Sequence, residues 1–248
     1  MVNWNKKIGW DKYIFSLGEI RDLIFITFII GFLFSATHEF FTYVSPASAI
    51  HNFFIASVSF LFVLIPYILV TKYFADRYNC NAEFALWPIG SIISIILTLL
   101  TQFVFAVVGA IQITTKHTTR LGYRFVGLTN EELGKIAIAG PVVNFLLALI
   151  GFAIYPLNPG IVSVFIMMNL IFAFFNLIPI PPLNGSKVFG WSRIVWAMFI
   201  SSILILIFLP DFIGTAFSIL IVVIMIIIIF LLSRLLSPWT PPTEIHKF

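Results

Sequence analysis

Long uncharged runs separated by short charged clusters make up most of this sequence. A helix that crosses a bilayer needs about 20 apolar residues, and six runs approach this length. They are 23–37, 50–71, the two parts of 136–186 on either side of the turn signal 155–160, 194–210 and 212–233. The pattern therefore predicts an all-α polytopic membrane protein with about six transmembrane helices.

A seventh uncharged run, Phe84–Thr115, is too long for one ordinary helix and barely long enough for two. If the run returns to the side it came from, all 14 basic residues of the chain lie on one face of the membrane. Basic loops are retained in the cytoplasm, so this arrangement is favoured over a single crossing. We therefore expect a re-entrant or hairpin segment at 84–115, packed inside the protein, and both termini in the cytoplasm.

The composition agrees with a membrane location. The chain is 60% hydrophobic and 10% charged, with a mean hydropathy of +1.09, so a soluble domain of this size could not bury its apolar surface. We expect a cytoplasmic segment at 1–22, a membrane domain at 23–236 and a cytoplasmic tail at 237–248. The first segment lacks the features of a signal peptide and is expected to be retained. The net charge of +4 is spread over loops, so nucleic acid is not an expected partner.

Three motifs carry the chemical information: "KYFADRYNCNAEFALWPIG" (72–90), "IAIAGPVVNFLLAL" (136–149) and "NLIPIPPLNGSKVF" (176–189). In this order and spacing they resemble the membrane-embedded zinc metalloproteases of the site-2 protease family. The resemblance covers about 60–193 and implies a site-2 protease-like core over that range.

In that family a His-Glu-x-x-His helix directly precedes the segment that matches 72–90, and an aspartate in the last motif completes the zinc site. The resemblance places Tyr67 and Thr71 at the histidine positions, Ile68 at the glutamate position and Asn184 at the aspartate position. Zinc prefers nitrogen, thiolate and carboxylate ligands. The resemblance thus implies a degenerate site with no intact catalytic residue and no bound cofactor. The hydroxyls of residues 67 and 71 share a helix face and could hydrogen-bond the Asn184 amide.

Other candidate residues are few. His38-Glu39 is the one His-Glu pair of the chain, and with His51 it offers an alternative metal site. The predicted topology puts these residues on the membrane face opposite Asn184, which disfavours that site. Asn144, close to the active-site cleft in the family, is expected either to fix helix contacts by hydrogen bonds or to contact a substrate.

Several functions remain open at this point. The first is a proteolytically inactive scaffold that binds transmembrane partners, including a partner's transmembrane helix, in the lipid bilayer. Backbone edges near 82–90 could then capture an extended peptide by strand addition. The second is an active intramembrane zinc metalloprotease with metal ligands recruited from elsewhere. A transporter or channel is a third and weaker hypothesis, because the predicted transmembrane segments contain few polar residues that could form a pathway.

Overall fold

The computed structural model describes residues 15–37, 46–115 and 128–208 and a few positions between 214 and 227. Most of this part of the chain is helical. In chain order the elements are α1 (Leu17–Ser35), α2 (Pro46–Arg77), β1 (Cys80–Leu86), α3 (Pro88–Thr101), β2 (Gly109–Thr115), α4 (Asn130–Ile154), the short 3-10 turn η1 (Tyr155–Leu157), α5 (Pro159–Asn176), α6 (Asn184–Trp191) and α7 (Arg193–Phe208).

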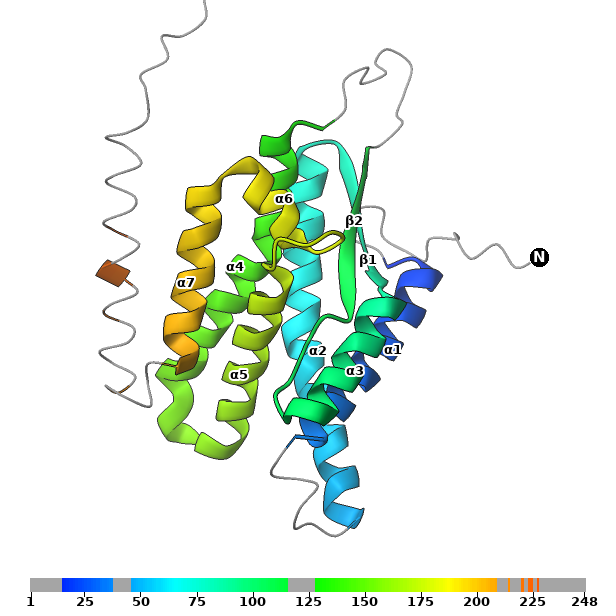
Figure 1. Cartoon of the computed structure of the whole chain (residues 1–248), viewed down its shortest axis with the longest axis vertical. Coiled ribbons are helices and arrows are strands. Elements are labelled where there is room, and N and C mark those ends of the chain that lie inside the picture. Colours follow the sequence, from blue (N-terminus) through cyan, green and yellow to red (C-terminus); the bar gives the residue numbers. More distant parts are fainter. Residues whose placement is uncertain are drawn as a thin grey trace, which may run out of the picture.

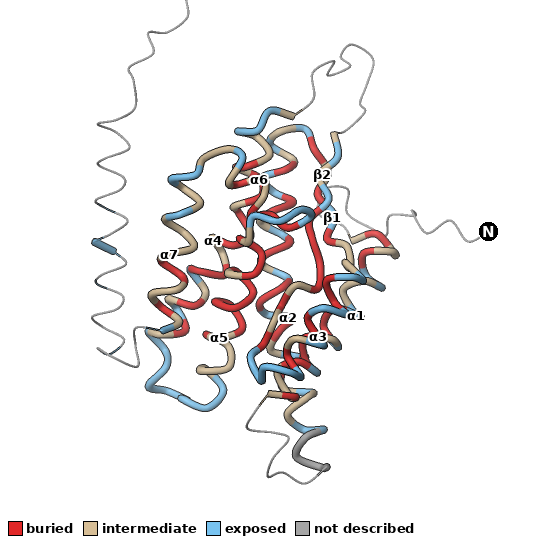
Figure 2. Tube along the Cα trace, viewed as in Figure 1, coloured by how far each residue is buried: buried red, intermediate tan, exposed pale blue. Residues whose placement is uncertain are grey.

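Helix α2 is the central element of the molecule (Figure 1). It packs against α1 and β1 on one side and against α4 and α5 on the other. Helix α6 lies on α4, and α7 completes the outer layer against α5. Buried residues concentrate on α2, β1 and the facing parts of α4 and α5 (Figure 2). The core therefore sits where the three motifs of the sequence meet.

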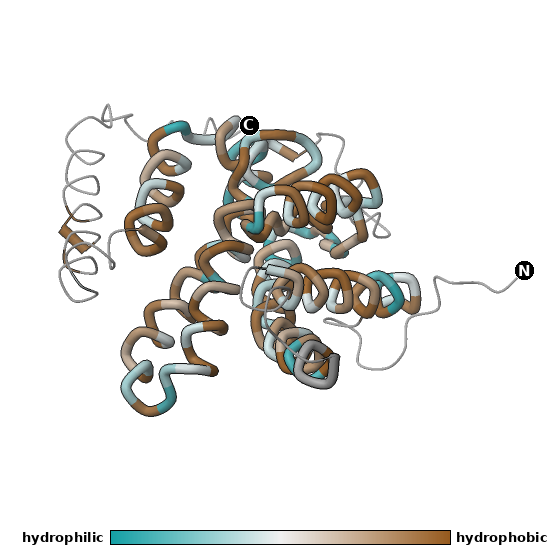
Figure 3. The backbone as a smooth tube through the Cα atoms, turned by 60° about the horizontal axis from the view of Figure 1, so that its bottom comes forward, coloured by the Kyte–Doolittle hydropathy of each residue, from teal (hydrophilic) through white to brown (hydrophobic). Residues whose placement is uncertain are grey.

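Three helical segments are long and apolar enough to cross a membrane: Ile50–Arg77, Asn130–Leu157 and Pro159–Asn176. These segments have a high mean hydropathy, and Figure 3 shows hydrophobic residues along most of the helices of the molecule. The chain is thus a membrane protein, but six spans are not found in the described residues. Helix α3 and helix α7 are apolar but shorter, and the expected span 212–233 lies almost wholly outside the described part.

The first expected span also differs from its prediction. Helix α1 begins at Leu17 rather than near residue 23, and its first turns contain Glu19, Arg21 and Asp22. Ser16 caps the helix by accepting a hydrogen bond from the Glu19 backbone N–H at 3.1 Å. Because the helix starts among charged residues, its uncharged part is shorter than a bilayer requires.

The run 84–115 does return, but it is not all-helical: the fold is mostly helical, as predicted, and it also contains a small two-stranded sheet that the all-α prediction did not include. Strands β1 and β2 pair as an antiparallel two-stranded sheet in which Leu86 is opposite Gly109. Helix α3 and an extended segment, 102–108, connect them. Since the two strands are antiparallel neighbours, the connecting segment ends beside the place where it started.

Hydroxyl groups on α3 make the extended segment 102–108 tolerable inside an apolar core. Thr98 Oγ1 accepts a hydrogen bond from the Phe105 N–H at 3.0 Å, and Ser94 Oγ accepts one from the Val107 N–H at 3.0 Å. Ser91 Oγ donates to the Val108 carbonyl at 3.2 Å. Non-helical backbone at membrane depth must be satisfied within the protein, and this row of hydroxyls satisfies it.

Carboxylates of α1 accept hydrogen bonds from backbone N–H groups of β1 that are not paired with β2. Glu19 Oε1 accepts from the Phe84 N–H at 3.0 Å, and Asp22 Oδ2 accepts from the Leu86 N–H at 3.1 Å. The second oxygen of Glu19 forms a buried ion pair with Lys72 Nζ at 2.6 Å. Burial raises the pKa of Glu19, whereas the hydrogen bonds from Lys72 and Phe84 lower it. Strand addition at β1 is therefore blocked at these two N–H groups, contrary to the expectation for 82–90.

Candidate functional site

Tyr67 lies in the middle of the core, with no exposed surface. Its ring packs edge-on against Phe172 of α5, with centroids 5.1 Å apart, and against Phe84 of β1 at 5.7 Å. Gly140 of α4 leaves the room for this ring, because a Cβ atom built there would lie 2.4 Å from Tyr67 Cε2. Gly140 of the second motif thus makes room for the tyrosine of α2.

Asn184 begins helix α6 and is also fully buried. Its Nδ2 atom donates to the Tyr67 hydroxyl at 2.7 Å and to the Ala137 carbonyl of α4 at 3.1 Å. The adjacent Gly185 packs directly on the Leu177 backbone, where a Cβ atom would come within 2.0 Å of the carbonyl oxygen. The last motif therefore holds Asn184 against α2 and α4 at once.

The Tyr67 hydroxyl continues this network to α5. It donates to Asn176 Oδ1 at 3.1 Å, and Asn176 Nδ2 donates to the Phe172 carbonyl at 2.9 Å. We call Tyr67, Asn176 and Asn184 the amide–phenol cluster. Its three side chains come from α2, α5 and α6, and all are 1% exposed or less. Asn176 was missed in the sequence, because an amide within an apolar run does not reveal which face of a helix it occupies.

Ile68 and Thr71, at the other two positions that the family resemblance assigns to the zinc site, are buried but are not part of the amide–phenol cluster. Ile68 belongs to the apolar core. Thr71 Oγ1 donates to the Tyr67 backbone carbonyl at 2.7 Å, within its own helix. The hydrogen bond predicted between Tyr67 and Asn184 is therefore present, whereas the one suggested between Thr71 and Asn184 is not. Threonine hydroxyls in helices commonly bond to the carbonyl four residues back, and Thr71 follows this rule.

Asn144 is fully buried on α4, and neither atom of its side-chain amide has a hydrogen-bond partner in the described part of the chain. The same holds for Asn169 Oδ1 and Asn184 Oδ1. A role for Asn144 in fixing helix contacts by hydrogen bonds thus finds no support among the described residues. Its role as a cleft residue remains a prediction.

The alternative metal site cannot be assembled from the described residues. His38 and Glu39 lie outside them. His51 is exposed near the start of α2, 16 residues before Tyr67, which corresponds to about 24 Å along a helix. His51 and the amide–phenol cluster therefore do not belong to one site.

The residues at the family positions do not suit zinc. They offer a phenol, an aliphatic hydroxyl and a neutral amide, none of which is a preferred zinc ligand. The phenol oxygen already donates one hydrogen bond and accepts another. Within the described ranges no group of three or more His, Cys, Asp or Glu side chains could hold a metal ion. The donor set and its hydrogen bonding thus disagree with the metal site that the motifs imply.

One basic side chain lies close to this region. Lys187, in the first turn of α6, donates to the carbonyls of Ile111 on β2 and Pro182, both at 3.2 Å. Burial lowers the pKa of the Lys187 amine to about 8. The outward-facing carbonyl of β2 at residue 111 is therefore covered by a side chain rather than by another strand.

Comparison with known proteins shows which family the chain belongs to. It is 33% identical over 190 residues to a protein of Methanocaldococcus jannaschii named "Putative zinc metalloprotease MJ0611", an alignment that covers 74% of this chain and 90% of that protein. The chain belongs to the site-2 protease-like family. The chain is also 37% identical over 68 residues to "Putative zinc metalloprotease YwhC" of Bacillus subtilis, an alignment that covers 21% of this chain and 31% of that protein. No family model and no solved structure matches the chain.

Proposed function

We propose that this chain is a non-cutting member of the site-2 protease-like family, a multi-pass membrane scaffold that binds a transmembrane segment of a partner protein. Both termini would face the cytoplasm, as the basic residues favour. The observation that carries the proposal is the hydrogen bond between Tyr67 and Asn184, at two positions where the family resemblance implies metal ligands.

Chemistry at these positions supports the absence of proteolysis. Ile68 cannot abstract a proton, and loss of a general base alone lowers a rate by about 10²–10⁴-fold. The neutral Asn184 carries no charge that would attract a cation, and its Nδ2 atom is committed to Tyr67 and Ala137. Neither a metal-bound water nor a positioned base is supplied by this set of side chains.

Binding is supported by what the fold retains. The sheet lies beside α2, and β2 has one edge that is not paired with β1. Lys187 covers the Ile111 carbonyl on this edge, and a flexible lysine side chain can be displaced by an incoming backbone N–H. An unwound partner segment would thus add to β2 rather than to β1, whose outer N–H groups are taken by carboxylates.

The test combines cleavage and binding in one preparation. Purified protein in phosphatidylcholine liposomes is incubated with a transmembrane peptide that carries a donor and a quencher fluorophore, with and without added zinc. We expect saturable binding of the peptide and no increase in donor fluorescence. Ile113→Pro on β2 should weaken binding of the peptide. The control Leu157→Pro, at an exposed position away from the sheet, should leave binding unchanged.

Three results would count against the proposal. Cleavage that a zinc chelator abolishes would show an active metalloprotease with recruited ligands. Peptide retention that is neither saturable nor sensitive to Ile113→Pro would remove the binding role. Ion or solute flux through the liposomes in place of binding would favour a transporter or channel.

A further inference from the structure

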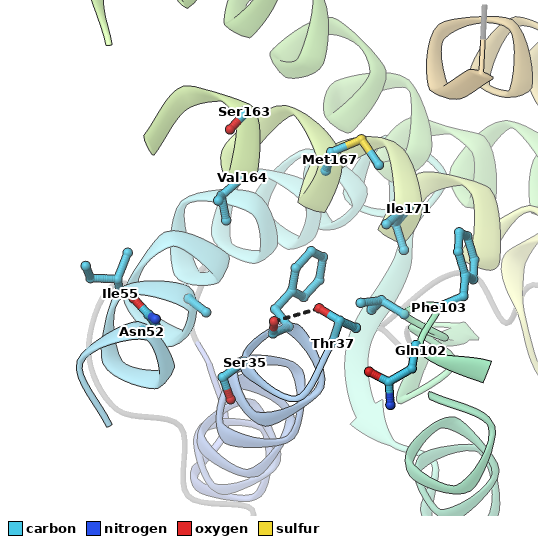
Figure 4. Close-up of a pocket in the computed structure, with 13 residues that line it drawn as sticks. Ser35, Thr37, Asn52, Ile55, Gln102, Phe103, Ser163, Val164, Met167 and Ile171 are labelled. Atoms are coloured by element: carbon cyan, nitrogen blue, oxygen red, sulfur yellow. Dashed lines mark hydrogen bonds between the residues drawn. The ribbon is translucent and has the colours of Figure 1, made fainter. Parts of the chain in front are cut away.

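A cavity of about 370 Å³ lies beside α2, and none of the described residues that line it belongs to the amide–phenol cluster. Ala56 lines it, and this residue precedes Tyr67 by 11 positions, or about 16 Å of helix. The walls come from the end of α1, the first half of α2, the segment after α3 and residues 163–171 of α5 (Figure 4). The volume falls within the range of small-molecule sites.

The inner wall of the cavity is apolar. Ala56, Val104 and Ile171 line it and are at most 5% exposed. Val164 and Met167, on the same side of α5 as Ile171, extend this surface (Figure 4). A ligand part that enters here must therefore be hydrocarbon, because a polar group would lose its hydration without gaining a partner.

Polar but uncharged side chains also line the cavity: Ser35, Thr37, Asn52, Gln102 and Ser163. The hydroxyl hydrogens of Thr37 and Ser163 are donated to the carbonyls of Phe34 and Gly160, both at 2.9 Å. Ser35 likewise donates to a carbonyl of its own helix. These oxygens are thus left as acceptors, which suits a ligand that brings hydroxyl donors.

The charge of the lining residues and the volume of the cavity restrict the class of ligand further. Among the described residues that line the cavity there is no Asp, Glu, Lys, Arg or His, so this part of the lining offers no counter-ion to a phosphate, carboxylate or ammonium group. One turn of a helix with side chains, about 10–12 Å across and 5.4 Å long, occupies roughly 400–600 Å³. The cavity is smaller than this, and its volume is enough for a single hydrocarbon chain.

We propose that this cavity binds the acyl chain of an uncharged, hydroxyl-bearing membrane lipid, such as a monoacylglycerol. The bilayer supplies such a ligand directly, because two walls of the cavity belong to the candidate spans of α2 and α5. The acyl chain lies against Ala56, Val104 and Ile171, and the hydroxyl groups donate to the oxygens of Thr37, Gln102 and Ser163. This site is separate from the amide–phenol cluster and does not depend on its function.

The test uses a monoacylglycerol with a photoreactive diazirine in its acyl chain, in nanodiscs of phosphatidylcholine. Wild-type protein should be labelled saturably, with the label on peptides that contain 52–56 or 163–171. Val164→Phe fills the cavity and should reduce labelling at least fivefold. Ile161→Phe adds the same ring on the same helix at a position that is 55% exposed, and should leave labelling unchanged. Thermal unfolding of each variant checks that it is folded, and Met167→Phe serves as a second filling variant.

Competition identifies the head group. Unlabelled monoacylglycerol should displace the probe, whereas the fatty acid of the same chain length, with its carboxylate, should compete at least tenfold more weakly. Equal labelling of wild type and both filling variants would mean surface lipid only and would overturn the proposal. Equal competition by the fatty acid, or displacement by a transmembrane peptide, would also overturn it.

Discussion

The side-chain amide of Asn184 donates a 2.7 Å hydrogen bond to the hydroxyl of Tyr67, although 117 positions separate the two residues in the chain. The bond joins α6 to α2 in the middle of the core. Through Tyr67 it continues to Asn176 at the end of α5. Three helices are thus held together by neutral hydrogen bonds at a place where the family resemblance implies a cation and its ligands.

Removal of the phenol hydroxyl should destabilise the protein. Tyr67→Phe keeps the ring but leaves Asn176 Oδ1 without its donor and takes one acceptor from Asn184 Nδ2. An unsatisfied buried polar group costs about 1–3 kcal/mol, so the free energy of unfolding should fall by about 2 kcal/mol. Denaturant titration in micelles measures this change. Tyr73→Phe, at a position that is 40% exposed, should alter stability by less than about 0.5 kcal/mol, and equal effects of the two variants would contradict the account.

Gly140 should not tolerate a side chain. In Gly140→Ala the new methyl group would lie 2.4 Å from the Tyr67 ring, so either the ring or α4 must move. Overpacking of this kind costs about 1–3 kcal/mol. Gly190→Ala is the matched control, because nothing lies within 4 Å of its Cβ position. The comparison is made by thermal unfolding, and a Gly140→Ala protein as stable as Gly190→Ala would show that the ring is not held there.

The buried ion pair between Glu19 and Lys72 should depend on both partners. Lys72→Met leaves the Glu19 carboxylate buried without its cation, a change that costs about 3–5 kcal/mol in other buried pairs. The double variant Glu19→Gln, Lys72→Met removes both charges and keeps an acceptor for the Phe84 N–H, so it should recover part of the loss. The measurement is the free energy of unfolding of the wild type, Lys72→Met and the double variant. A double variant less stable than Lys72→Met would contradict it.

Lys187 should react as a neutral amine near physiological pH. Its pKa of about 8 means that half of the amine is unprotonated at that pH, so acylation by an amine-reactive reagent should show a midpoint there. Peptide mass spectrometry follows the site, and Lys187→Met should remove it. Because the folded pKa lies below the usual 10.5, the folded state binds fewer protons between pH 8 and 10.5, and stability should rise with pH in that window. A reaction midpoint near 10.5 would refute the effect of burial.

Part of the site could be predicted from the sequence because motif spacing sets register. The positions of Tyr67 and Asn184 followed from the flanking motifs, and their contact is present. Thr71 was assigned a bond to Asn184 that its own helix supplies instead. Asn169 and Asn176 could not be placed, since an isolated amide in an apolar run does not indicate a face or a partner.

The hairpin shows a similar division. The return of 84–115 could be predicted from the basic residues around it, because their distribution depends on topology alone. The sheet was missed, although "CNAEFAL" (Cys80–Leu86) alternates apolar and polar residues until Ala85, a pattern typical of a strand. The positions of the basic residues indicate on which side of the membrane a loop lies, but they do not indicate whether a segment is a helix or a strand. The carboxylates of Glu19 and Asp22 that stabilise β1 lie more than 60 positions away, beyond the reach of any local pattern.

Zinc stoichiometry shows whether neutral side chains have replaced a metal site in this chain. Wild-type protein and a variant with Tyr67→His, Ile68→Glu, Thr71→His and Asn184→Asp are purified in the presence of zinc and analysed by elemental mass spectrometry. We expect less than about 0.1 zinc per wild-type chain and close to one per fourfold variant, since two imidazoles and a carboxylate are preferred ligands. One zinc per wild-type chain, or none in a folded fourfold variant, would contradict it.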